Sequence, residues 1–135
     1  MEKTYFGACH CGAVEFEVDV DLEQGTRRCN CTFCAKVRNW VGSTTPDKLR
    51  VTKGEDGLGS YSARSGAQHE HCFCTTCGVR VFSRGHIEEM GDFASPMISV
   101  LNLSPGELAG LTIVYQDGRH DNWRNPPAEI ETRYL

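Results

Sequence analysis

Apolar and polar residues alternate strictly along the segment AVEFEVDV, residues 13–20. One face of this segment is apolar and carries Val14, Phe16, Val18 and Val20. The other face is acidic and carries Glu15, Glu17 and Asp19. Because successive side chains of a β-strand point to opposite faces, the pattern predicts a strand that is buried on one side only.

Six further segments are typical of short strands, since apolar and β-branched residues are bounded there by turn residues. These segments are residues 39–45, 49–54, 59–64, 79–85, 97–103 and 111–118. Only SPGELAGL, residues 104–111, favours a helical turn, with Ser104 as N-cap, Pro105 at the first position and Glu107 at the third. The predicted fold class is therefore mainly β, built from short antiparallel strands.

The chain has 135 residues, of which 39% are hydrophobic and 14 are glycine. This length fits one domain with a core of modest size. We expect a single domain over residues 1–135, with its core at about residues 5–123. The tail, residues 124–135, contains Pro126 and Pro127 and is predicted to be extended along the surface.

The net charge of −4 does not suggest a nucleic-acid-binding surface. No apolar run approaches the roughly 18 residues that a membrane helix needs. The first residues, MEKTYFGACH, lack the apolar stretch of a secretory signal. These features predict a cytoplasmic protein, in a compartment where thiols stay reduced.

Eight cysteines in a reducing compartment favour metal binding over a disulfide framework, which would need export. They form three clusters, a C-x-C followed by two C-x-C-x-x-C motifs. The clusters are Cys9 and Cys11; Cys29, Cys31 and Cys34; and Cys72, Cys74 and Cys77.

A structural zinc site takes four tetrahedral ligands and commonly joins two distant chain segments. Cys9 and Cys11 precede the first long strand, and Cys74 and Cys77 precede Gly78, which suits a tight turn. We therefore predict a closed four-thiolate zinc site from these four cysteines. Such a site would contribute much of the folding free energy of a small β protein.

The middle cluster, Cys29, Cys31 and Cys34, then offers three thiolates and an open fourth position, as in a catalytic zinc site. One alternative is a closed site in which Cys72 is the fourth ligand, and another is a site that is empty or oxidised. In a strand, Cys72 would face the same way as Cys74, with His69 and His71 on the opposite face. We favour the open site, with Cys72 spare beside it.

The motifs GACHCGAVEFEV, RRCNCTFCAK, FCTTCGVRVF and YQDGRHDNW resemble those of the glutathione-dependent formaldehyde-activating (GFA) family, which includes centromere protein V. The resemblance extends from Tyr5 to about Trp123. It implies a β-tent fold of two sheets with metal sites at their edge. It also implies that the first and last cysteine pairs share a structural zinc and that Cys29, Cys31 and Cys34 hold a catalytic zinc.

The resemblance further implies a carbon–sulfur lyase that adds glutathione to formaldehyde, giving S-hydroxymethylglutathione. An open zinc suits this chemistry because it lowers the pKa of a bound thiol and polarises an aldehyde oxygen. Glutathione has two carboxylates, and four cations flank the middle cluster. These candidate glutathione contacts are Arg27, Arg28, Lys36 and Arg38. A solvated charged turn is the alternative interpretation of the same cations.

Two further function classes stay open at this point: a non-catalytic zinc-stapled binding module, and a thiol redox or metal-handling protein. Trp40 is assigned to core packing and the DGRHDNW segment to a turn, with His120 its one evident proton-transfer group. The expected cofactors are two zinc ions per chain, and the expected partners are a small thiol and an aldehyde. Neither nucleic acid nor membrane is expected, and a homodimer is left open.

Overall fold

The computed structural model describes residues 1–63 and 68–135. Its strands are β1 (Lys3–Ala8), β2 (Glu15–Val20), β3 (Thr26–Cys29), β4 (Trp40–Val41), β5 (Leu49–Lys53), β6 (Leu58–Tyr61), β7 (His69–Cys74), β8 (Arg80–Ile87), β9 (Gly91–Pro96) and β10 (Ile113–Gln116). Its α-helices are α1 (Thr32–Val37), α2 (Pro105–Ala109) and α3 (Glu129–Thr132). Short 3-10 turns connect several of these elements.

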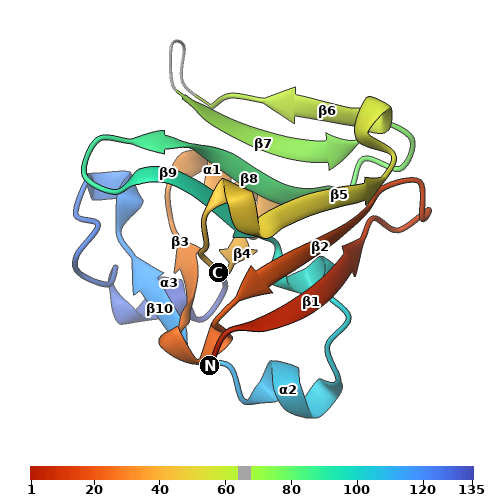
Figure 1. The fold of residues 1–135 in the computed structure, drawn as a ribbon. Coiled ribbons are helices and arrows are strands. Elements are labelled where there is room, and N and C mark those ends of the chain that lie inside the picture. Colours follow the sequence, from red (N-terminus) through yellow and green to blue (C-terminus); the bar gives the residue numbers. More distant parts are fainter. Residues whose placement is uncertain (64–67) are drawn as a thin grey trace.

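The described strands form three small sheets (Figure 1), in the orders β1-β2-β5, β10-β3-β4 and β6-β7-β8-β9. The mainly β class is confirmed, with the strands divided among three sheets rather than the expected two. The expectation of antiparallel pairing alone is wrong for one pair, because β10 runs parallel to β3. This pairing places the late segment after β10 next to the cysteines that follow β3.

The alternation in β2 is confirmed by its burial. Val14, Phe16, Val18 and Val20 are each at most 1% exposed and belong to one core cluster. Phe16 meets Phe82 of β8 edge to face, with ring centroids 5.4 Å apart. Burying each such side chain stabilises the fold by roughly 1.5–3 kcal/mol, so β2 anchors the core.

Most of the predicted strands are present, in part or in full, as β4, β5, β6, β8 and β10. Arg64, the last residue of the segment predicted at 59–64, lies outside the described residues. The strand predicted at 97–103 is wrong: Ile98–Val100 is a 3-10 turn. Ile98 is fully buried there, so the apolar pattern reflects packing in the core and not a ladder.

The helix predicted near residue 104 is confirmed as α2. The Ser104 hydroxyl accepts from the Glu107 N–H and the Glu107 carboxylate accepts from the Ser104 N–H, as in a capping box. The extended tail is wrong in part, because Glu129–Thr132 forms α3. Helix α1 was not predicted; its six residues are too short to show an apolar period.

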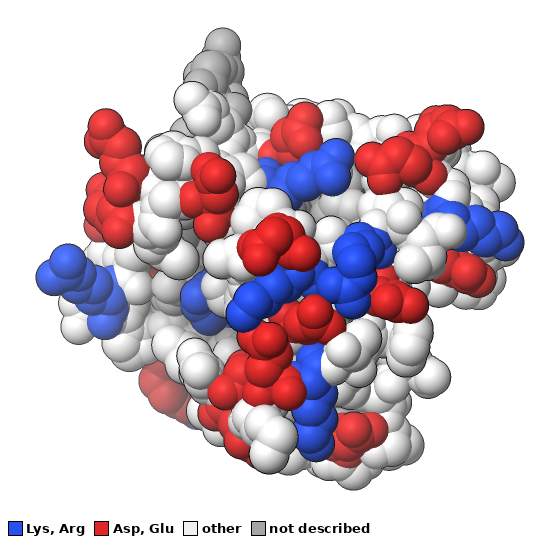
Figure 2. Space-filling view, in the orientation of Figure 1, with Lys and Arg blue, Asp and Glu red and all other residues white. Residues whose placement is uncertain are grey.

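Acidic and basic side chains are interspersed on the face shown in Figure 2. Several of them form exposed pairs, as where Arg50 of β5 lies 3.1 Å from Asp19 and 3.3 Å from Glu17 of β2. Such pairs contribute little to stability individually. Among the described residues, no helix has the length and apolar character to cross a membrane.

Candidate metal centres

Four cysteines from two distant parts of the chain meet at one edge of the fold. Cys9 and Cys11 follow β1, Cys74 ends β7, and Cys77 lies in the turn after it. Their sulfur atoms all lie within 4.8 Å of one another, and Cys11 Sγ is 3.7 Å from both Cys9 Sγ and Cys74 Sγ. Zinc bound tetrahedrally at about 2.3 Å by four thiolates sets the sulfur atoms about 3.8 Å apart. The four-cysteine group therefore fits zinc without rearrangement.

Backbone N–H groups support the ionised form of Cys9 and Cys77, whereas burial and the neighbouring thiols raise the pKa of Cys11 to about 11. The Val14 N–H donates to Cys9 Sγ at 3.3 Å. Backbone N–H groups of Cys11 and Val79 lower the pKa of Cys77 to about 6. Because the thiolate is the form that binds metal, these donors favour metal binding near neutral pH.

The middle cluster forms a second group, in which the three sulfur atoms also lie within 4.8 Å of one another. Cys29 ends β3 and is buried, Cys31 is the N-cap of α1, and Cys34 lies within α1. The Cys31 N–H donates to Cys29 Sγ at 3.4 Å, and the Cys34 N–H donates to Cys31 Sγ at 3.2 Å. Hydrogen bonds among the three thiols lower the pKa of Cys31 and raise the pKa values of Cys29 and Cys34. The three sulfur atoms lie close enough together to bind one cation.

Cys72 joins neither of the two groups of potential metal ligands found among the described residues. Its side chain is 1% exposed and packs in the core cluster with Phe16 and Phe82. Burial raises the pKa of Cys72, so its thiol is held protonated. The three-cysteine group has no fourth Cys, His, Asp or Glu ligand in the part of the chain that the structure describes.

His69 and His71 of β7 also join neither group among those residues. As expected from alternation, His71 faces away from Cys72: its ring lies 4.1 Å from the ring of Phe33, and 4.3 Å from that of His69. Phe33 stands between Cys31 and Cys34 in α1. Burial lowers the pKa of His71 to about 3. The lowered pKa values keep both histidine rings neutral at pH 7. The ring of His71 packs on Phe33 of the three-cysteine loop, and the ring of His69 packs on His71.

Asn30, between Cys29 and Cys31, ties the three-cysteine group to the end of the chain. Its buried amide donates to Asp117 Oδ1 at 2.7 Å and to Glu131 Oε1 of α3 at 3.1 Å. The N–H of Arg119 donates back to Asn30 Oδ1, and its guanidinium Nε donates to the Asn30 carbonyl, both at 3.0 Å. Nothing in the C-N-C pattern distinguishes this residue, and its role was not predicted.

The DGRHDNW segment thus forms part of the surroundings of the three-cysteine group. Donation from Asn30 lowers the pKa of the Asp117 carboxyl, and His120 reinforces the effect. His120 is largely exposed, and its Nδ1 lies 2.9 Å from Asp117 Oδ1. The turn assigned to this segment is present as the 3-10 turn Gly118–His120.

The four candidate glutathione contacts all lie near the three-cysteine group along the chain, but their side chains diverge. Arg28 lies over the Trp40 ring, with its Cζ 4.7 Å from the ring centroid. Alternation in β3 places Arg27 on the opposite face of the sheet, which is the face of Cys29. Lys36 and Arg38 are exposed on and just after α1.

Arg28 is held against the Trp40 ring, although one of its polar atoms lacks a hydrogen bond within the described part of the chain. Its Nε is buried and has no hydrogen-bond partner among the described residues. Burial lowers the pKa of Arg28, and the nearby charge of Arg38 lowers it further. Trp40 Nε1 donates to the Thr26 hydroxyl at 2.8 Å, which fixes the ring beneath the guanidinium. The Arg28 guanidinium is thus held against the Trp40 ring.

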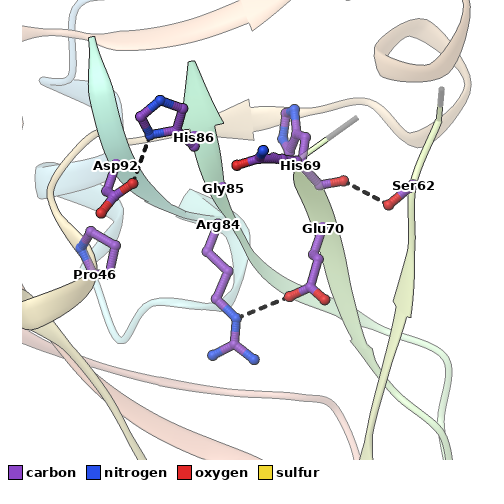
Figure 3. Close-up of a pocket in the computed structure, with 9 residues that line it drawn as sticks. Pro46, Ser62, His69, Glu70, Arg84, Gly85, His86 and Asp92 are labelled. Carbon is purple, nitrogen blue, oxygen red and sulfur yellow. Dashed lines mark hydrogen bonds and ion pairs between the residues drawn. The ribbon is translucent and has the colours of Figure 1, made fainter. Parts of the chain in front are cut away.

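A separate pocket of about 440 Å³ lies on the sheet of β7, β8 and β9 (Figure 3). Arg84 donates to Glu70 there at 3.3 Å, and His86 pairs with Asp92 at 2.8 Å. No cysteine is among the described residues that line it. The charged side chains described in its lining are paired with one another.

Fold and sites together define a small, mainly β protein with two cysteine groups able to hold zinc. The chain belongs to the family described as glutathione-dependent formaldehyde-activating enzyme, whose family model matches residues 4–112. A solved crystal structure of a Rhodobacter sphaeroides protein, a structural genomics target, is similar over 81% of this chain and 99% of its own, with 28% identity and a TM-score of 0.68. The range matched by the family model, residues 4–112, contains all eight cysteines.

Proposed function

We propose that the protein is a zinc-dependent carbon–sulfur lyase that adds a thiol, glutathione, to formaldehyde or a related aldehyde at the three-cysteine group. The observation that carries the proposal is the gathering of Cys29, Cys31 and Cys34 without a fourth ligand among the described residues. Three protein ligands and an open position are typical of catalytic zinc sites. Membership of the formaldehyde-activating family supports the assignment.

Zinc held by the three cysteines would supply a Lewis acid that lowers the pKa of the thiol and polarises the aldehyde oxygen. In the reaction, the thiol sulfur forms a bond to the carbonyl carbon, the carbon–oxygen π bond breaks, and the thiol proton ends on oxygen. The chain's own part is to hold the thiolates in place, which Asn30 and the N–H groups of α1 do. His120, exposed and paired with Asp117, is the group in this segment suited to carry the proton.

Recognition of glutathione is assigned to Arg28 and Arg38. Two guanidiniums match the two carboxylates of glutathione, and stacking on Trp40 limits the entropy that Arg28 loses on binding. Arg38 follows α1, the helix that carries Cys34, and its Nη1 donates to the Tyr134 carbonyl at 2.6 Å. Arg27 and Lys36 are assigned a supporting electrostatic role, since neither stacks on Trp40.

Both metal groups require reduced thiols, which supports a cytoplasmic location for the proposed enzyme. Its proposed partners are a small thiol and an aldehyde, with no nucleic acid and no membrane. The homodimer stays a prediction that the sequence leaves open.

The proposal is tested by replacing zinc with cobalt and titrating glutathione. We expect two metals per chain and a change in the cobalt–thiolate absorption of one of them when glutathione is added. A Cys29→Ser, Cys34→Ser double variant, which keeps the four-cysteine group, should keep one cobalt and lose the response. A wild-type spectrum that glutathione leaves unchanged, together with no S-hydroxymethyl product by NMR, would overturn the proposal.

The assignment of the cations has its own test. Arg28→Glu and Arg38→Glu should each weaken glutathione binding by about tenfold or more, since each replaces attraction for a carboxylate by repulsion. Lys53→Glu, an exposed change on β5, makes the same change in net charge and serves as the control. Equal loss in all three variants would show an effect of net charge alone.

A further inference from the structure

Arg80, the first residue of β8, connects the four-stranded sheet to the three-cysteine loop. Its Nη1 donates to Asn39 Oδ1 at 2.8 Å, and its Cζ lies 5.1 Å from the centroid of the Phe33 ring. Phe33 stands between two of the cysteines, and the Asn39 N–H donates to the Cys34 carbonyl at 3.0 Å. One guanidinium therefore touches the loop both between its cysteines and just after the helix that carries Cys34.

The other side of the same guanidinium is anchored in the sheet. Nη2 donates to the Ser83 hydroxyl at 3.1 Å and lies 2.9 Å from His71 Nδ1. Because the guanidinium can only donate, His71 Nδ1 accepts, and the proton of the neutral ring is on Nε2. The Nε of Arg80 is buried without a hydrogen-bond partner among the described residues. The geometry fixes the guanidinium from three directions but leaves its charge without a neutralising group among these contacts.

None of the hydrogen-bond partners found for Arg80 in the described parts of the chain is a carboxylate. Arg80 is partly buried, and a cation taken out of water without a counter-charge is destabilising. Burial lowers the pKa of Arg80, whereas the sulfur atoms of Cys34 and, less strongly, Cys72 raise it. The contacts of the guanidinium with Phe33 and Asn39 direct it to the loop that carries Cys31 and Cys34, so the three-cysteine group is the counter-charge that its position indicates.

We infer that Arg80 is a positioning residue of the three-cysteine group, whose fixed guanidinium balances the excess negative charge of a metal held by three thiolates and braces the loop through Phe33 and Asn39. Three thiolates around a dication leave one net negative charge, and the guanidinium supplies one positive charge. The inference rests on metal binding by this group, which the proposed function also requires. It adds that the negative charge of the site is balanced by a residue of the protein, Arg80, and not by the substrate.

Arg80 contributes a positive charge and a set of contacts that hold the loop, and variants can separate these two contributions. Arg80→Met removes both the charge and the hydrogen bonds. Arg80→Lys keeps the charge and loses the planar fork, and Asn39→Ala keeps the charge and removes one brace. Partners that orient metal ligands typically change metal affinity by about 10–100-fold when removed.

The experiment measures the zinc dissociation constant of each site with a competing chelator and the cobalt–thiolate absorption of each variant. We expect Arg80→Met to weaken the three-cysteine site by about 10–100-fold and to leave the four-cysteine site unchanged. Arg80→Lys should recover most of the affinity, and Asn39→Ala should lose less than Arg80→Met. Arg84→Met, on the same strand with its charge paired to Glu70, is the matched control and should match the wild type.

Wild-type affinity and spectrum in Arg80→Met would overturn the inference, and so would an Arg80→Lys variant as weak as Arg80→Met, because charge would then not matter. Retention of the four-cysteine metal reports whether each variant is folded. If Arg80→Met loses that metal, Arg80→Gln, which keeps hydrogen-bond donors without charge, replaces it and is judged by the same outcomes. Failure of glutathione to change the wild-type cobalt spectrum would remove the proposed function but leave this comparison of metal affinities intact.

Discussion

Gly118 packs directly on the sulfur of Cys29. A Cβ atom on Gly118 would lie 2.5 Å from Cys29 Sγ and 2.4 Å from the Trp123 ring, closer than carbon atoms approach in folded proteins. The turn after β10 therefore packs closely against one side of the three-cysteine group. Only glycine fits at this position.

Gly118→Ala should push the turn away from Cys29 and weaken metal binding at the three-cysteine group. Overpacking of this kind typically costs about 1–3 kcal/mol. Urea unfolding and metal stoichiometry measure the two effects. Gly57→Ala is the control, because no atom lies within 4 Å of its Cβ position. A Gly118→Ala variant with wild-type stability and two tightly bound metals would show that the turn moves freely.

The two cysteine groups should differ in what their loss does to the fold. Cys77→Ser removes a ligand from the group that joins β1 to β7, so we expect loss of that metal and of several kcal/mol of stability, about 3 or more. Cys34→Ser should remove only the other metal and leave the four-cysteine group bound. Thermal unfolding monitored by circular dichroism, with metal analysis of the folded fraction, distinguishes them. Equal destabilisation by both substitutions would contradict the division into a structural and an open site.

Cys72→Ser should keep both metals, because Cys72 belongs to neither cysteine group among the described residues. The serine hydroxyl would be buried in an apolar cluster, so we expect a loss of about 1–3 kcal/mol of stability in denaturant unfolding. Cys72→Ala introduces no polar atom and should cost less. Loss of one metal in Cys72→Ser alone would instead show that Cys72 completes the second site.

The stability of the fold should depend on pH through His71. Burial, followed by His69 and Arg80, lowers the pKa of His71 from 6.5 to about 3. Between these values the unfolded chain binds a proton that the folded chain does not, so stability falls as the pH decreases from 6.5 towards 3. His71→Gln lacks this titration and should show a shallower decrease. Since both proteins have the same cysteines, the difference between their urea midpoints across this range isolates the histidine, and parallel curves would contradict the prediction.

Hydrophobic periodicity and helix-capping residues were sufficient to predict the elements whose own sequence has a clear pattern. The alternation around Phe16 predicted β2, and the Ser104–Glu107 pair predicted α2. Spacing and turn chemistry likewise predicted the four cysteines that the structure brings together. The 3-10 turn at Ile98 was mistaken for a strand because a buried apolar run has the same composition in either conformation.

The surroundings of the three-cysteine group could not be predicted, because they depend on contacts between residues far apart in the chain. Asn30 meets Glu131 and Arg119, and Arg80 meets Asn39 and Phe33, in pairs that no local pattern encodes. Strands β1, β3, β7 and β9 were not among the predicted strands for a similar reason, since they are recognised by their pairing with other strands and not by their own sequences. The role of Cys72 as a ligand or a spare thiol stays a prediction for the variant above.

The parallel pairing of β10 with β3 has a consequence for the order of events during synthesis. Cys29, Cys31 and Cys34 leave the ribosome long before Gln116, Gly118 and Glu131, the residues that pair with or cover their loop. During that interval the nascent chain presents three neighbouring thiols without their cover. Delivery of metal to this loop and protection of its thiols from oxidation are therefore needed during translation, before the protein is complete.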